Sequence, residues 1–116
     1  MARTVLVVDD NIRICELLTE FLANQDYAVL CANEGAEALA MLDGQTPDLA
    51  VIDLLLDGNV SGDDVIDRAI ELRVPVVTMS GALASDRRGR DLRTKHLQKP
   101  FKMAALQSAI DSLLEQ

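Results

Sequence analysis

Hydrophobic residues recur along the chain in two alternating patterns. One is a short run that is apolar at nearly every position, which is typical of a strand covered on both faces in a parallel sheet. Four such runs are clear, and a weaker one precedes Pro100. The predicted strands are 4–9, 27–32, 49–53, 74–80 and 95–99.

The segments between these strands repeat apolar residues at i, i+3 and i+4, which is the spacing of an amphipathic helix. Ile14, Leu17 and Leu18 begin one such face. Residues 82–95 are poor in apolar side chains and contain Gly89, so any helix there is expected to be short or frayed. The predicted helices are 11–25, 34–42, 62–72 and a final segment that begins near Met103.

This alternation predicts an α/β fold of the (βα)5 type, in one domain that spans residues 1–116. The sheet is expected to be doubly wound, with five parallel strands, right-handed crossovers and helices on both faces. In such sheets, ligands bind outside the carboxyl ends of the strands. The polar residues that end each strand are therefore the candidates for chemistry.

Charged and hydroxyl side chains stand at four of these strand ends. Asp9 and Asp10 end the first strand, Asp53 the third, Ser80 the fourth and Lys99 the fifth. Three carboxylates at one edge would repel one another unless a cation lay between them. A hard divalent cation such as Mg²⁺ suits such oxygen ligands, and the lysine adds a positive charge that suits a bound anion.

Each of these residues also has a simpler explanation. An aspartate of the first pair could cap the following helix, although one cap needs only one of the two. Asp53 could be a turn residue, Ser80 a hydroxyl that bonds its own turn, and Lys99 a solvated lysine. All of these explanations would have to hold together, which favours a shared site.

Composition and net charge indicate the class of protein and argue against some kinds of partner. With 49% apolar and 26% charged residues, the chain resembles ordinary soluble proteins. No apolar run approaches the roughly 20 residues that span a membrane, and the start lacks a secretory signal, so we expect a cytoplasmic protein. The net charge of −8 argues against nucleic-acid binding. Cys15 and Cys31 have no metal-ligand spacing to His96 and are expected to be buried, reduced thiols.

The charge is uneven along the chain. Residues 86–102 contain seven Lys and Arg against two Asp, a local balance of +5, and the remainder carries −13. A run of this kind is most often a solvated face. The alternative is a surface that docks an acidic partner.

The sequences "VLVVDDN", "LAVIDLLL", "VVTMSG" and "LQKPF", in this order, resemble the receiver domain of bacterial two-component response regulators. The resemblance covers essentially the whole chain and implies a chemotaxis-receiver-like, flavodoxin-like fold with strand order 2-1-3-4-5. It implies a domain that accepts a phosphoryl group from a histidine kinase or histidine phosphotransfer protein. The surface of the fourth helix, fifth strand and fifth helix would then switch to control a downstream protein partner.

The same resemblance implies a role for each acidic residue. Asp53 would be the phosphoacceptor. Mg²⁺ (or Mn²⁺) would be held by Asp10, Asp53 and the backbone carbonyl of Leu55, with Asp9 reaching it through water. The domain would not be an enzyme, although it would assist its own magnesium-dependent phosphorylation and dephosphorylation.

The remaining motif residues would handle the phosphoryl group and the switch. Ser80 and Lys99 would bind phosphoryl oxygens, and Gly81 would leave room for the group. A cis peptide bond is implied between Lys99 and Pro100. His96 lies three residues before Lys99, where receivers often carry the aromatic switch residue, so it is either that residue or a solvated histidine.

Two features depart from the family pattern. Gly62 follows Asp53 by nine residues rather than eight, so the loop between them is expected to be one residue longer. Leu55 offers no polar side chain to orient a hydrolytic water, and slow self-dephosphorylation is expected.

Other functions fit the sequence less well than that of a receiver. A phosphorylation-independent, degenerate receiver would be expected to lose Asp10, Asp53 or Lys99, and all three are present. A haloacid-dehalogenase-like hydrolase would need a second aspartate two residues after Asp53, where this chain has Leu55. The chain could also be a receiver fragment of a larger regulator or hybrid kinase. The initiating methionine and the closing helix favour a full-length protein.

Overall fold

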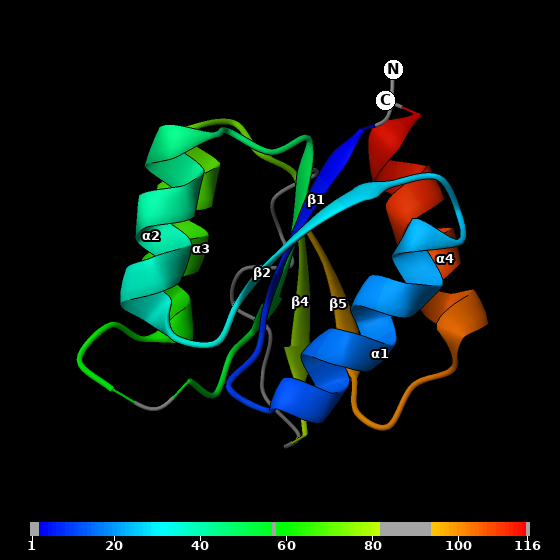
Figure 1. The fold of residues 1–116 in the computed structure, drawn as a ribbon, viewed down its shortest axis with the longest axis horizontal. Coiled ribbons are helices and arrows are strands. Elements are labelled where there is room, and N and C mark those ends of the chain that lie inside the picture. The colour runs from blue at the N-terminus through cyan, green and yellow to red at the C-terminus, as the bar shows by residue number, and fades with distance from the viewer. Residues whose placement is uncertain (1–2, 57, 82–93, 116) are drawn as a thin grey trace.

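A computed structural model describes residues 3–56, 58–81 and 94–115 of the chain, and Figure 1 shows its fold. The strands are β1 (Thr4–Val8), β2 (Ala28–Ala32), β3 (Leu49–Asp53), β4 (Val76–Ser80) and β5 (Thr94–Gln98). The described helices are α1 (Ile12–Ala23), α2 (Gly35–Gly44), α3 (Gly62–Glu71) and α4 (Met103–Leu114). The short helix expected between β4 and β5 falls almost entirely outside the described residues.

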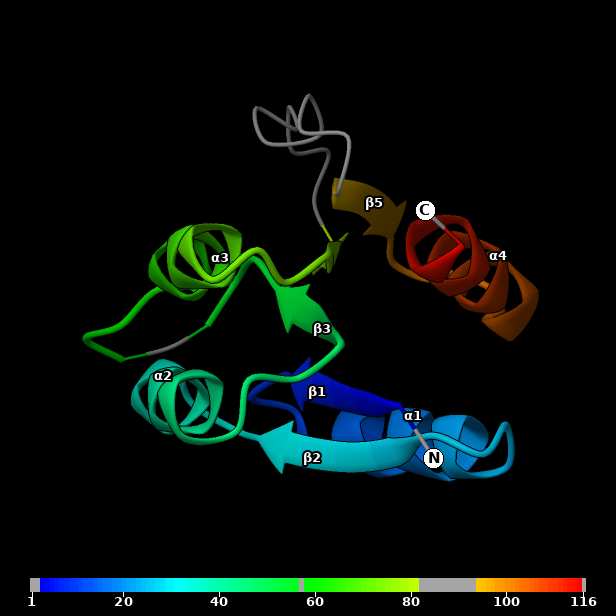
Figure 2. The same cartoon turned by 90° about the horizontal axis from the view of Figure 1, so that it is seen from above.

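The five strands form one parallel sheet in the order β2-β1-β3-β4-β5. Helices α1 and α4 cover one face, and α2 and α3 cover the other (Figure 2). The doubly wound prediction is therefore confirmed, and with it the strand order that the resemblance implied. Most element boundaries differ from the predicted ones by one to three residues.

Hydrophobic side chains of each strand divide between the two faces, because successive residues of a strand point in opposite directions. In β1, Val5 and Val7 pack in the cluster beneath α1 and α4, whereas Leu6 and Val8 pack in the cluster beneath α2 and α3. All four are fully buried. Two-sided burial explains why the strand sequences are nearly continuous apolar runs, and each such side chain stabilises the fold by roughly 1.5–3 kcal/mol.

The first helix is capped by neither aspartate of the pair. The side chain of Asn11 accepts hydrogen bonds from the backbone N–H groups of Arg13 and Ile14, so Asn11 is the N-cap of α1. The capping explanation for Asp9 and Asp10 is therefore wrong.

The described part of the chain contains no helix that is both long and apolar enough to cross a membrane.

Candidate functional site

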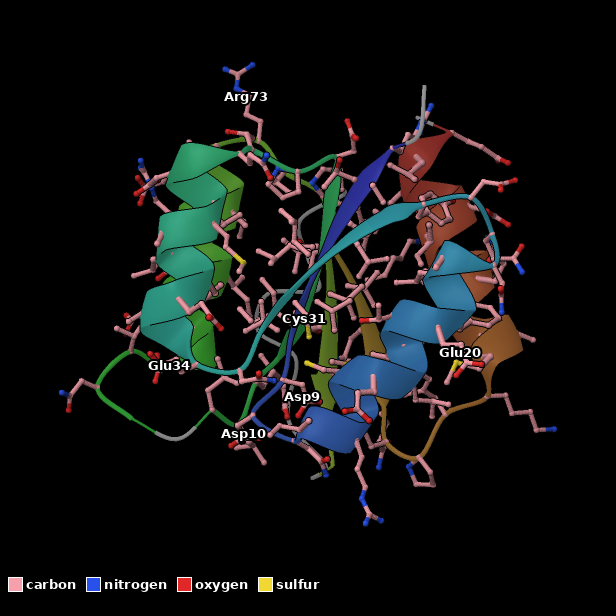
Figure 3. The ribbon with its side chains drawn as sticks, in the orientation of Figure 1. Asp9, Asp10, Glu20, Cys31, Glu34 and Arg73 are labelled. Atoms are coloured by element: carbon pink, nitrogen blue, oxygen red, sulfur yellow. The ribbon has the colours of Figure 1, made fainter. Side chains whose placement is uncertain are left out.

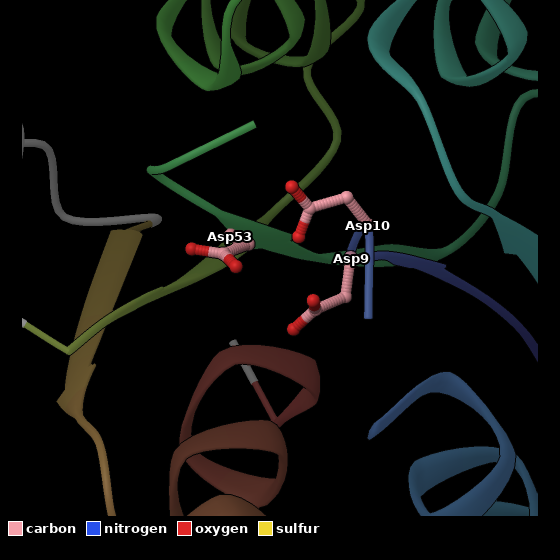
Figure 4. A group of neighbouring side chains, drawn as sticks. All are labelled: Asp9, Asp10 and Asp53. Carbon is pink, nitrogen blue, oxygen red and sulfur yellow. The ribbon is translucent and has the colours of Figure 1, made fainter. Parts of the chain in front are cut away.

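Three aspartates meet at the carboxyl edge of the sheet. Asp9 and Asp10 follow β1, Asp53 ends the neighbouring β3, and one carboxylate oxygen from each lies within 4.8 Å of the others (Figure 4). Asp9 and Asp53 are buried, whereas Asp10 is exposed. Since buried carboxylates this close repel one another, the arrangement requires positive charge nearby.

Lys99 supplies that charge from the loop between β5 and α4. Its ammonium group donates to Asp9 Oδ2 at 2.9 Å and to Asp53 Oδ2 at 3.1 Å. The Lys99–Pro100 peptide bond is cis. The backbone N–H of Lys99 donates to the carbonyl of Ser80 at 2.7 Å, which ties this loop to the end of β4. The lysine therefore bridges the acidic residues of two strands.

Burial and ion pairing shift the pKa values of Asp9 and Lys99 in opposite directions. Burial raises the pKa of Asp9 above 3.8, although hydrogen bonds from Lys99 and Asn11 lower it in part. For Lys99, burial alone would lower the pKa, but the hydrogen bonds to Asp9 and Asp53 outweigh it and raise the value above 10.5. Lys99 thus remains a cation at neutral pH, fixed beside the Asp53 carboxylate.

The backbone around Asp53 is closely packed. Its Oδ1 accepts the backbone N–H of Leu55 at 2.9 Å. Gly62 lies so close that a Cβ atom added there would overlap the Asp53 carbonyl oxygen and lie 2.9 Å from Leu54 Cα. The loop after Asp53 therefore returns to the backbone of that residue, and only glycine fits the contact.

The other predicted site residues lie around this centre. Ser80 is buried at the end of β4, and the neighbouring Gly81 is exposed. Among the described residues, no atom lies within 4 Å of a Cβ built on Gly81, so space is open beside it. The side chain of Leu55 is exposed.

His96 lies on the face of the sheet that carries Thr78. The two residues are register partners on β5 and β4, and His96 Nδ1 is 2.6 Å from the Thr78 hydroxyl oxygen. His96 is half-buried, so it is not a fully solvated histidine. The sequence reasoning missed Thr78, although a lone hydroxyl in an otherwise apolar strand was a usable signal.

The structure describes only residues 94–102 of the basic run at 86–102. Its arginines and Asp86 and Asp91 lie outside the described residues. Lys95 and Lys102 are exposed, but Lys99 is turned into the acidic site. Lys99 therefore does not belong to a solvated basic face.

Two side-chain hydrogen bonds also hold the backbone carbonyl of Asp9. Its carbonyl oxygen accepts from Cys15 Sγ at 3.3 Å and from Asn33 Nδ2 at 3.1 Å. The sequence predicted that Cys15 and Cys31 are both buried thiols, which is confirmed for Cys15 but wrong for the half-buried Cys31. It did not point to Asn33. The place of Asn33 directly after β2, at the same edge of the sheet, was the signal available for it.

The donor set fits a hard divalent cation. Carboxylate oxygens are the ligands that Mg²⁺ prefers in proteins, and an exposed member leaves one side of the group open to solvent. Asp9, Asp10 and Asp53 each offer a carboxylate oxygen that could hold such an ion.

Comparison with known proteins identifies the family. The model of the response regulator receiver domain matches residues 5–111. The chain belongs to the response regulator receiver domain family. Its structure is similar to a response regulator receiver protein from Sinorhizobium medicae WSM419, with a TM-score of 0.89 and 28% identity over 98% of this chain and 95% of that one.

Two curated relatives agree with this assignment. Sporulation initiation phosphotransferase F of Bacillus subtilis (strain 168) is 28% identical, over 98% of this chain and 95% of its own length. The response regulator GtcR of Aneurinibacillus migulanus is 33% identical over 69% of this chain, and the match covers only 33% of that relative. As a receiver domain, the chain belongs to two-component signalling, where receivers interact with histidine kinases or phosphotransfer proteins and are generally not enzymes.

Proposed function

We propose that this receiver domain, spanning residues 1–116, accepts a phosphoryl group on Asp53 from a histidine kinase or a histidine phosphotransfer protein in the cytoplasm. The observation that supports it best is the position of the Asp53 carboxylate, which is buried beside the acidic pair and lies 3.1 Å from the Lys99 ammonium group. A nucleophile, a candidate cation site and a fixed positive charge are the parts that phosphoryl transfer needs.

In the proposed reaction, a carboxylate oxygen of Asp53 attacks the phosphorus of a phosphohistidine. The phosphorus–nitrogen bond breaks, the histidine nitrogen takes up a proton, and an acyl phosphate remains on Asp53. The Leu55 N–H holds Oδ1 of the nucleophile in place during this step. Lys99, already hydrogen-bonded to Oδ2, can follow the negative charge onto the phosphoryl oxygens.

A divalent cation would add to this charge neutralisation when it is bound. Asp10, Asp53 and the backbone carbonyl of Leu55 are the proposed ligands, and Asp9 would contact the ion through water. The exposure of Asp10 and the burial of Asp9 support this division.

Signal output would begin at Ser80. Its hydroxyl lies at the end of the strand next to β3, where it can be drawn to a phosphoryl oxygen on Asp53, and Gly81 leaves space beside it. We propose that this movement alters β5, including His96, and α4, the last helix of the chain and the fifth in the predicted (βα)5 order. The affinity for a downstream protein would change as a result.

Incubation with acetyl phosphate and Mg²⁺, followed by intact mass measurement, tests the proposal. The wild type should gain one phosphoryl group, and Asp53→Asn should gain none. Asp63→Asn is a matched control, because it removes an acid from the first turn of α3 and should still be phosphorylated. A wild type that gains no phosphoryl group, even with its kinase, would show a phosphorylation-independent interaction module instead.

A further inference from the structure

The chain's two cysteines lie on neighbouring elements behind the acidic site. Cys15 projects from α1 and is fully buried, whereas Cys31 on β2 is half-buried. Cys15 belongs to the hydrophobic cluster beneath α1 and α4, and Cys31 packs against this cluster. Cys15 Sγ lies 3.8 Å from the carbonyl oxygen of Ala32, the residue after Cys31. Burial and the neighbouring Cys31 thiol raise the pKa of Cys15 to about 12. Figure 3 labels Cys31 and Asp9, and the Asp9 N–H donates to the same carbonyl of Ala32 at 3.1 Å.

The two thiols also share a route to solvent. Both line a cavity of about 390 Å³ between α1 and β2, together with the polar side chains of Glu16, Thr19 and Asn33. This cavity is large enough to admit a small hydroperoxide such as hydrogen peroxide. The half-buried Cys31 is therefore the thiol that such an oxidant reaches first, and Cys15 lies behind it.

Cys15 connects this cavity to the acidic site. Its thiol donates to the carbonyl oxygen of Asp9 at 3.3 Å and accepts from Asn33 Nδ2 at 3.4 Å. Asn33 Nδ2 also donates to the same Asp9 carbonyl at 3.1 Å. Loss of the thiol hydrogen of Cys15 would remove one of the two side-chain donors that hold the backbone of Asp9.

We propose that Cys15 and Cys31 form a redox-active pair, which a hydroperoxide converts into an intramolecular disulfide with loss of the Cys15–Asp9 hydrogen bond. The sulfur of Cys31 attacks one peroxide oxygen, the O–O bond breaks, and an alcohol or water leaves with a proton, so that Cys31 becomes a sulfenic acid. The sulfur of Cys15 then attacks the Cys31 sulfur, and the hydroxyl leaves as water with the Cys15 proton. The two thiols are oxidised and one hydroperoxide is reduced.

The test treats the folded protein with hydrogen peroxide, then unfolds it in the presence of an alkylating reagent and measures its mass. The oxidised wild type should lose two hydrogen atoms and take up no alkyl group. Trypsin leaves both cysteines in the peptide 14–68, and a further cut after Glu20 separates them only if no disulfide joins them. The joined fragments should part after reduction with dithiothreitol.

Cys31→Ser is the control variant, because Cys31 is only half-buried and its replacement leaves the packing of Cys15 in place. This variant should keep a free, alkylatable Cys15 under the same treatment and should not lose two hydrogen atoms. Three results would overturn the proposal: two alkyl groups on the treated wild type, a gain of oxygen without a disulfide, or a disulfide that joins two chains.

The connection to the acidic site has its own measurement. In nitrogen–proton NMR spectra, oxidation of the wild type should shift the amide resonances of Asp9, Asp10 and Asn11, and dithiothreitol should restore them. The amide of Gly44, at the far end of α2, serves as the reference and should stay in place. A disulfide that leaves the Asp9 amide unmoved would refute the connection. Neither measurement depends on the phosphorylation of Asp53.

Discussion

Replacing Lys99 with methionine tests the electrostatic account of the acidic site directly. Methionine keeps much of the aliphatic stem but removes the ammonium group that lies 2.9 Å from Asp9 Oδ2 and 3.1 Å from Asp53 Oδ2. Two buried carboxylates would then face each other without their shared counter-charge. We expect the folded state to be strongly destabilised when no divalent cation is present.

The size of this effect follows from two opposing contributions. Opposite unit charges about 4 Å apart attract by about 4 kcal/mol at an effective dielectric constant of roughly 20. Much of this is offset by the cost of taking the groups out of water, and removal of one partner of a buried pair costs about 3–5 kcal/mol. The Lys99 side chain is 20% exposed, and Asp9 can take up a proton because burial raises its pKa. We therefore expect a loss of about 3 kcal/mol, at the lower end of that range.

Urea unfolding in EDTA and in excess Mg²⁺ measures this loss. An ion bound among the carboxylates stabilises the folded state by mass action. Mg²⁺ should stabilise Lys99→Met more than the wild type, in which the lysine competes for the same oxygens. Lys102→Met removes an exposed lysine and should change the free energy of unfolding by less than about 0.5 kcal/mol. A loss below about 1 kcal/mol in EDTA, or a larger Mg²⁺ effect on the wild type, would refute the reasoning.

Three further predictions rest on other contacts. Gly62→Ala pushes a Cβ into the Asp53 carbonyl and should cost about 1–3 kcal/mol in urea unfolding, whereas Gly44→Ala meets open space and should be neutral or stabilising. Asn11→Ala removes the cap of α1 and should cost about 0.5–2 kcal/mol, so an unchanged midpoint would contradict the capping role. Because the pKa of Lys99 is raised in the folded state, its ion pairs add stability that is fully present below pH 10.5 and is lost as the pH rises through the folded-state pKa. Alkaline pH should therefore lower the free energy of unfolding of the wild type more than that of Lys99→Met.

The sequence predicted the convergence of the acidic residues because topology alone produces it. Once the apolar runs are recognised as parallel strands, Asp9, Asp53 and Lys99 must fall at the same edge of the sheet, whatever their side-chain rotamers. The same reasoning predicted the fold class, because covered strands and amphipathic helices leave clear local patterns. These features depend on pattern and order, which a single sequence carries in full.

Contacts that depend on register were not predictable in this way. The pairing of Thr78 with His96 requires that β4 and β5 align those two residues, and no local pattern encodes that alignment. The contacts of Cys15 and Asn33 with the Asp9 carbonyl likewise join a helix to the ends of two strands. The sequence also did not identify Asn11 as the cap of α1, because Asp and Asn are nearly equal as N-caps and three candidates stood in a row.

The two adjacent aspartates after β1 lie in different surroundings. Asp9 is buried, and its carboxylate is already committed to the protein, with Oδ1 on the Asn11 N–H and Oδ2 on Lys99. An ion bound directly to Asp9 would have to displace one of these contacts. Asp10, one residue further, is exposed at the open side of the group, where an ion from solvent arrives first. The buried residue thus positions the lysine beside Asp53, and we expect the exposed one to contact an ion that binds from solvent.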